Sequence, residues 1–352
     1  MNSNKAVFWW LLSGCLLVFI MVVVGGITRL THSGLSMTDW HLVTDTFPPT
    51  TDEAWNQAFE AYKQFPEYQK INQFQPGGFH LSDYKDIYFW EWFHRFIGGR
   101  VLGPVFLFPF LYFWFKKKLD KATLYRCFIL LGMGAFQGFL GWFMVKSGLL
   151  NDPDVSHFRL SMHLTFAFIT FAYTFWVALQ YAAPIQSAII PVQLRRLART
   201  TLFVLLVQIA YGGFVAGLDA GLVHNHWPLM SDGQFMHESI WLEKDSWFLR
   251  FTESKSGVQF VHRMLALTLV VLISTLSFKA RKLTGIPALS WGIKAMLFGL
   301  FMQFSLGVFT LLYGVPFWLG VAHQAMAFVL LASVIFVLFQ LRGTKVLFSN
   351  TK

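Results

Sequence analysis

The chain has 352 residues, of which 55% are hydrophobic, 18% aromatic and only 13% charged. This balance is far too apolar for a water-soluble domain of that size and indicates a polytopic membrane protein. The net charge of +10 does not indicate nucleic-acid binding, because the basic residues fall between apolar runs and form no continuous basic face.

A helix needs about 20 apolar residues to cross a bilayer, and eight runs of the sequence reach that length. They cover roughly 7–27, 88–115, 123–145, 159–181, 200–218, 257–278, 292–313 and 317–341. The first is expected to be a retained helix, since no small-residue cleavage site is evident. The second contains Pro104 and Pro109, so a kink is expected there. The sequence therefore predicts an all-α polytopic membrane protein.

The basic residues predict which side of the membrane each connection faces. Sixteen lysines and arginines, with Asp120 as the only acid, lie at the two termini and around every second connection. These segments are expected in the cytoplasm of a bacterium, so that both termini lie on the cytoplasmic side of its plasma (inner) membrane. The long loops at about 28–87 and 219–256 then face outward. Because they are rich in aromatic residues, we expect them to cap the helix ends, with 53–63 as a short amphipathic helix at the interface.

Four sets of residues recur in the same order and predict two four-helix halves, 1–190 and 191–352, related as parallel repeats. Near the ends of helices one and five, two glycines, a Gly-Leu pair and a tryptophan recur at identical intervals. These residues are Gly25-Gly26, Gly34-Leu35 and Trp40, and then Gly212-Gly213, Gly221-Leu222 and Trp227. The other matches are Glu91-Trp-Phe-His94-Arg95 with Gln259-Phe-Val-His262-Arg263, Gln137-Gly-Phe-Leu140-Gly141 with Gln303-Phe-Ser-Leu306-Gly307, and His163 with His323.

The repeat places one histidine near the outer end of each of four helices: His94, His163, His262 and His323. Helices two and four supply one pair, and helices six and eight supply the other. Two imidazoles across a bundle core are the ligands of a six-coordinate haem iron, or the distal and proximal partners of an open one. Zinc is disfavoured because no further Cys, His or carboxylate accompanies the second pair. For any single histidine, a hydrogen-bonded bundle residue without a metal is the alternative.

The residues around the histidines suit a porphyrin. Glycines let a flat macrocycle approach the backbone, and Arg95 and Arg263 are expected to pair with haem propionates, unless they extend to lipid headgroups. Glu91 of the first half is replaced by Gln259 in the second, and glutamine cannot titrate. A carboxylate can move a proton or stabilise positive charge, so chemistry is predicted in the first half. The alternative is that Glu91 is a solvated interfacial acid.

Taken together, these motifs resemble the haem A synthase family over nearly the whole chain, and most closely its longer branch with alphaproteobacterial and mitochondrial members. The resemblance rests on five stretches: Glu91-Trp-Phe-His94-Arg95-Phe-Ile-Gly98, Gly141-Trp-Phe-Met-Val-Lys-Ser-Gly-Leu149, Arg159-Leu-Ser-Met-His163-Leu164, Asn225-His-Trp-Pro-Leu-Met230 and His323-Gln324. It implies an eight-helix enzyme that oxidises the C8 methyl of haem O to the formyl group of haem A. It also implies haem b on His262 and His323, substrate haem on His94 and His163, and an essential role for Glu91.

The resemblance implies haem O, membrane lipid and an electron acceptor as partners, and no nucleic acid is expected. Contact with haem O synthase and a homo-oligomer are left open. The first outer loop lacks the cysteine pair of some members, and Cys15 and Cys127 are expected to be small core residues. Two rival functions are a dihaem b-type cytochrome that only relays electrons, which leaves Glu91 unexplained, and a transporter, which predicts no haem.

Overall fold

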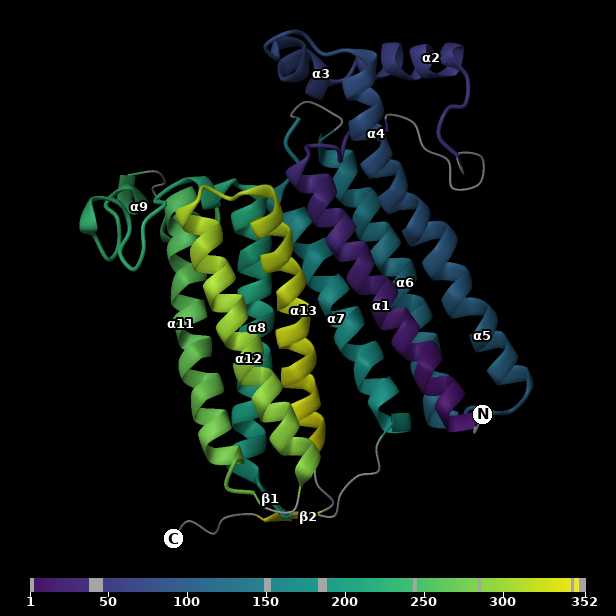
Figure 1. The fold of residues 1–352 in the computed structure, drawn as a ribbon, viewed down its shortest axis with the longest axis vertical. Coiled ribbons are helices and arrows are strands. Elements are labelled where there is room, and N and C mark those ends of the chain that lie inside the picture. The colour runs from purple at the N-terminus through teal and green to yellow at the C-terminus, as the bar shows by residue number, and fades with distance from the viewer. Residues whose placement is uncertain are drawn as a thin grey trace.

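The computed structural model describes residues 3–37, 47–148, 153–182, 189–242, 246–283, 286–342 and 345–347. Within these residues, eight helices are long and apolar enough to cross a membrane, as the sequence predicts. Seven are α1 (Ser3–Leu30), α6 (Lys121–Gly148), α7 (His157–Ala182), α8 (Val192–Gly217), α11 (Lys255–Ala280), α12 (Pro287–Leu312) and α13 (Phe317–Gln340). Figure 1 shows them as a bundle of nearly parallel rods, and the protein is a multi-pass membrane protein.

The remaining span, Leu81–Phe115, consists of three segments. These are α4 (Leu81–Phe96), a π-helical stretch η2 (Ile97–Leu102) and α5 (Gly103–Phe115). Pro104 has no N–H to donate to the carbonyl of Arg100, and its ring crowds that carbonyl, so the widened turn precedes it. The irregularity expected from the prolines is therefore present as a π-helical segment, while Pro109 lies inside α5.

The fifth span begins at Val192, eight residues before the predicted start. Apolar length alone placed the start after a group of arginines, but these residues form the first turns of α8. Arg195 lies there and donates through Nε to the Leu341 carbonyl at 3.2 Å, which connects α8 to the end of α13. Beside this contact, β1 (Ile189–Pro191) pairs in parallel with β2 (Lys345–Leu347), a small exception to the predicted all-α fold.

The two predicted halves meet along α1 and α7 on one side and α8 and α13 on the other. Phe168 of α7 and Phe328 of α13 stack at this junction, with ring centroids 3.9 Å apart. Each lies five residues after the repeat histidine of its helix, so two equivalent positions are in direct contact. This is the contact that a pseudo-two-fold relation would give, and the division into two repeat bundles remains a prediction.

The first outer loop forms a cap above α4, as expected (Figure 1). It contains α2 (Asp52–Tyr62), α3 (Pro66–Lys70) and η1 (Asn72–Phe74). Thr51 caps α2 by accepting a hydrogen bond from the Ala54 N–H, which confirms the predicted helix. Its buried Tyr62 stacks on Tyr84 of α4, so its apolar face meets protein instead of the membrane interface.

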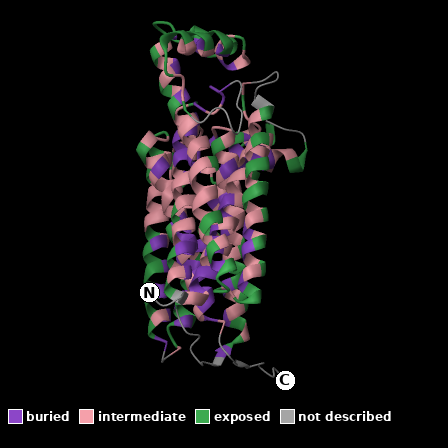
Figure 2. Cartoon of the chain, turned by 90° about the vertical axis from the view of Figure 1, so that its right-hand side faces the viewer, coloured by how far each residue is buried: buried purple, intermediate pink, exposed green. Residues whose placement is uncertain are grey.

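The second outer loop contains η3 (Ala220–Leu222), η4 (Ser231–Gly233), α9 (Ser239–Leu242) and α10 (Trp247–Thr252). Figure 2 shows exposed residues on the outer surface of the spans and buried ones between them. Large apolar side chains such as Phe203 and Trp291 are exposed, which is the pattern of helices that face lipid. Trp40 of the predicted repeat and Leu149 of the family motif lie outside the described residues.

Candidate functional site

Each of the four predicted histidines lies against a glycine of a neighbouring helix. A Cβ added to these glycines would come within 2.8 to 3.5 Å of an imidazole ring atom. The pairs are Gly25 with His94, Gly141 with His163, Gly212 with His262, and Gly307 with His323. The four rings therefore point between helices, not into lipid, and glycine is what leaves room for them. The same contact occurs at equivalent positions of both halves.

The structure also brings the histidines together in the predicted pairs. His94 lies within electrostatic range of His163, and His262 lies within range of His323. Among the described residues, no group of three or more His, Cys, Asp or Glu side chains is arranged to hold a metal ion. The arrangement is thus two separate imidazole pairs, one in each half.

Several buried polar atoms beside these pairs lack a hydrogen-bond partner among the described residues. They are Gln137 Oε1, Gln208 Oε1, Gln303 Oε1, His262 Nδ1 and Arg263 Nε. Such atoms are rare in protein interiors, so their grouping around the histidines indicates a polar ligand there. A haem fits two of these atoms, because its iron takes an imidazole nitrogen such as His262 Nδ1 and its propionates accept from a guanidinium such as that of Arg263. The glycines expected to admit the flat macrocycle are instead in contact with imidazole rings or other side chains.

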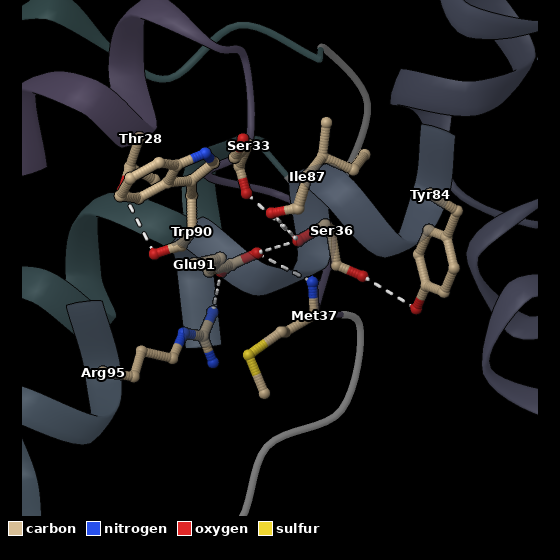
Figure 3. A network of polar contacts seen from close by, with 9 residues as sticks. All are labelled: Thr28, Ser33, Ser36, Met37, Tyr84, Ile87, Trp90, Glu91 and Arg95. Atoms are coloured by element: carbon tan, nitrogen blue, oxygen red, sulfur yellow. Dashed lines mark hydrogen bonds and ion pairs between the residues drawn. The ribbon is translucent and has the colours of Figure 1, made fainter. Parts of the chain in front are cut away.

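Glu91 is held at the end of α4 by donors from two directions (Figure 3). Its Oε2 accepts from the Ser36 hydroxyl at 2.7 Å and from the Met37 N–H at 2.8 Å, while its Oε1 pairs with Arg95. The side chain is 3% exposed, so the alternative of a solvated interfacial acid is wrong. Buried carboxylates need such donors, because an unpaired buried charge is costly.

Gln259 occupies the equivalent place with the opposite hydrogen-bond polarity. Its Nε2 donates to the carbonyls of Ala220, at 2.8 Å, and Val223, and its Oε1 accepts from Arg263 at 2.8 Å. In the repeat register, Val223 corresponds to Ser36, so a carbonyl stands where the first half has a hydroxyl donor. The exchange of glutamate for glutamine is therefore matched by its surroundings, which supports a real difference between the halves.

The two arginines do not extend to headgroups. Arg263 is 6% exposed and donates to the His226 carbonyl at 3.0 Å and the His224 carbonyl at 2.6 Å, which fixes the second outer loop over α11. Arg95 is largely buried and pairs with Glu91. Pairing with propionates stays a prediction. In the second outer loop, His224 Nε2 lies 2.9 Å from Ser256 Oγ of α11.

Sequence reasoning missed Ser36 and Gln208. The Gln208 amide lies 3.2 Å from His262 Nε2, and Ser36 is fully buried against Glu91. Both would have emerged from comparing the repeat position by position, because Ser36 corresponds to Val223 and Gln208 corresponds to Met21. Differences between repeats at positions near a candidate ligand are thus a usable signal.

The fold and the site define a multi-pass membrane protein with two half-buried histidine pairs, one of which adjoins a buried carboxylate. Residues 8–335 match the COX15-CtaA family, described as cytochrome oxidase assembly protein, and the chain belongs to this family. It is 68% identical to the Heme A synthase of Flavobacterium psychrophilum over 96% of this chain and 98% of the relative. It is 63% identical to that of Flavobacterium johnsoniae over 97% and 99%, and 41% identical to that of Parvibaculum lavamentivorans over 93% and 92%.

Proposed function

We propose that this chain is a haem A synthase that oxidises the C8 methyl of haem O to the formyl group of haem A. The family and the name shared by its close relatives support the activity. The observation that carries the assignment to this chain's own residues is Glu91, a buried carboxylate beside one histidine pair and replaced by an amide beside the other. A dihaem cytochrome with two electron-carrying sites has no need for that difference, and the comparisons give it no support.

The two histidine pairs have different roles in this proposal. His94 and His163 bind the iron of the substrate haem O, with Arg95 near its propionates. His262 and His323 hold a resident haem b, with Arg263 near its propionates through the buried Nε that has no partner among the described residues. That haem b supplies one-electron transfer when bound. The halves 1–190 and 191–352 are thus a substrate unit and an electron-transfer unit.

Glu91 acts at the methyl edge of the substrate. Ser36 and the Met37 N–H hold one carboxylate oxygen, so the group has a fixed direction before the substrate binds. A preoriented carboxylate stabilises positive charge that develops at the methyl carbon, and it accepts a proton that this carbon loses. Burial strengthens both effects because the local dielectric is low.

The charge distribution supports the orientation. The basic connections are placed in the cytoplasm and the cap outside, in the plasma (inner) membrane of a bacterium, with both haem sites toward the outer side. Haem O reaches the first site from within the membrane, and haem O synthase is the enzyme class that supplies it. A methyl-to-formyl conversion replaces two hydrogens of the methyl group by one oxygen atom and removes electrons from the substrate, so an oxygen donor and an electron acceptor are both required.

The test is haem analysis of the purified protein, made in a host that supplies haem O but forms no haem A. Haem A is expected with the native chain. Glu91→Gln should keep haem b and lower haem A at least about 100-fold, the range typical of a lost acid–base group. Glu67→Gln, which changes a buried carboxylate in the cap, is the matched control and should keep haem A formation.

His262→Ala should insert in the membrane but lose the haem b spectrum. Normal haem A formation by Glu91→Gln would contradict the role of that residue. A native protein that holds haem but forms no haem A would instead support the electron-relay function.

A further inference from the structure

Three of the four histidine rings have a glutamine side chain against them. The Gln137 amide lies 3.3 Å from His163 Nδ1 and 3.5 Å from its Nε2, and the Gln303 amide lies 3.3 Å from His323 Nδ1 and 3.4 Å from its Nε2. The Gln208 amide lies 3.2 Å from His262 Nε2, and the amide group can present either its oxygen or its nitrogen to that ring. For the fourth ring, that of His94, the described residues provide no hydrogen bond.

Met21 explains the difference. It precedes Gly25 by four residues, as Gln208 precedes Gly212 by four, and the two glycines contact His94 and His262 respectively. Met21 therefore holds the position in the first half that Gln208 holds in the second.

The Met21 side chain packs against η2, where a Cβ on Gly98 would lie 3.0 Å from its terminal methyl. A thioether is only a weak acceptor for an imidazole N–H, whereas a glutamine amide offers a strong acceptor oxygen, and the three rotatable bonds of methionine make it a poor support for a ring.

Support of this kind determines how firmly a histidine holds a metal. A metal-ligating imidazole donates the N–H of its other nitrogen, an acceptor for that N–H fixes the orientation of the ring, and loss of such a partner typically weakens metal binding 10- to 100-fold. Both rings of the second half have this support, whereas only His163 has it in the first half. The two histidine pairs thus differ in the support of their rings, in addition to the difference between Glu91 and Gln259.

We infer that His94 is the more easily released ligand of the first haem site, which His94 and His163 would form. The methionine at position 21, where the second half has a glutamine, weakens the hold of His94 on the iron. This rests on the proposed function, in which the first haem site must discharge its haem after each reaction while the second keeps its own. Gln208 is a positioning residue for His262, and His163 is the ligand that stays bound while the substrate haem enters or leaves.

Reciprocal exchange of the two side chains tests this. Purified Met21→Gln and Gln208→Met proteins are mixed with excess apomyoglobin, and the transfer of each haem is followed by its absorption. The b-type and the O- or A-type haems are told apart by their pyridine complexes. In the native protein the haem of the first haem site should leave at least about 10-fold faster than haem b. Met21→Gln should slow its release about 10-fold, and Gln208→Met should speed haem b release by a similar factor.

Met21→Leu is the matched control, because leucine fills a similar space without a polar group, and its release rate should equal that of the native protein. Electron paramagnetic resonance adds a second readout, since the low-spin ferric signal of haem b depends on the orientation of its axial imidazoles and should change in Gln208→Met. Equal release rates in native protein and both exchange variants would overturn the inference while leaving haem A formation intact. Native protein without any bound haem would overturn the proposed function as well.

Discussion

Ser36 decides how the carboxylate of Glu91 is presented. Its hydroxyl is fully buried and donates to Glu91 Oε2 at 2.7 Å. In Ser36→Ala, Glu91 Oε2 keeps the hydrogen bond from the Met37 N–H and loses the one from the hydroxyl. The loss of one hydrogen bond to a buried charged group costs about 1.5–3 kcal/mol. We expect haem A formation to fall about 10- to 100-fold, measured by haem extraction, with haem b content unchanged.

Ser33→Ala is the control for that change. The Ser33 hydroxyl lies 2.7 Å from Thr31 Oγ1 and makes no contact with Glu91, and the Ser33 carbonyl, which accepts from Ser36, remains. Equal loss of haem A in both variants would mean that the segment around Ser36 acts only through its fold.

How far residues can be predicted from sequence depends on whether they belong to a repeated pattern. The four histidines and Glu91 were predictable, because an ionisable residue at a repeated place in an apolar helix is costly and is kept for a purpose. Contacts to Glu91 were not predictable, since Ser36 lies 55 residues away in an outer loop and its approach depends on the course of the chain.

The cap contains an element whose stability should depend on pH. Glu67 of α3 is buried and accepts from the Tyr62 hydroxyl at 2.9 Å. Burial raises the pKa of Glu67 to about 7, although the hydrogen bond from Tyr62 acts in the opposite direction. The protonated form is therefore favoured in the folded cap. Since the unfolded group titrates near 4.5, cap stability should fall as pH rises from about 4.5 to about 7, by roughly 3 kcal/mol in all.

Hydrogen exchange over residues 52–74 measures this stability. Protection of the native cap should drop between pH 5 and pH 8 relative to Glu67→Gln at the same pH, because glutamine keeps an acceptor for Tyr62 but does not ionise. The comparison at equal pH removes the pH dependence of exchange itself. Equal hydrogen-exchange protection of the native cap and the Glu67→Gln cap at every pH would contradict the titration of Glu67 in this range.

At the scale of elements, length and composition predicted the spans well and their irregularities poorly. Pro104 and Pro109 predicted a kink in the second span, but the sequence could not show that the irregularity would be the π-helical segment Ile97–Leu102. The choice between a kink and a widened turn depends on neighbours such as Met21, which packs against Gly98. The first turns of α8 were missed because the sequence does not show that Arg195 at this helix end donates to a carbonyl at the end of another helix.

For the whole molecule, the sequence could not show which helix faces meet across the halves. The spans are apolar all round, so periodicity does not separate a protein-facing side from a lipid-facing side. Small residues give the better signal, since helices in lipid approach closely where side chains are short. Gly213 is such a place: the Ser161 hydroxyl of α7 donates to the Ala210 carbonyl of α8 at 2.7 Å beside it.

Gly213→Ala should therefore weaken the junction of α7 and α8. The new Cβ would lie 2.7 Å from Ser161 Cα, a backbone atom that cannot turn aside, so the helices must separate. Overpacking of this kind costs about 1–3 kcal/mol and should lower the thermal midpoint by several degrees, measured by unfolding of the purified protein. Gly26→Ala should cost less, because the atom it meets is the flexible end of Gln324. Gly138→Ala on α6, with open space around it, should leave the midpoint unchanged, and an equal shift in all three variants would contradict a close α7–α8 contact.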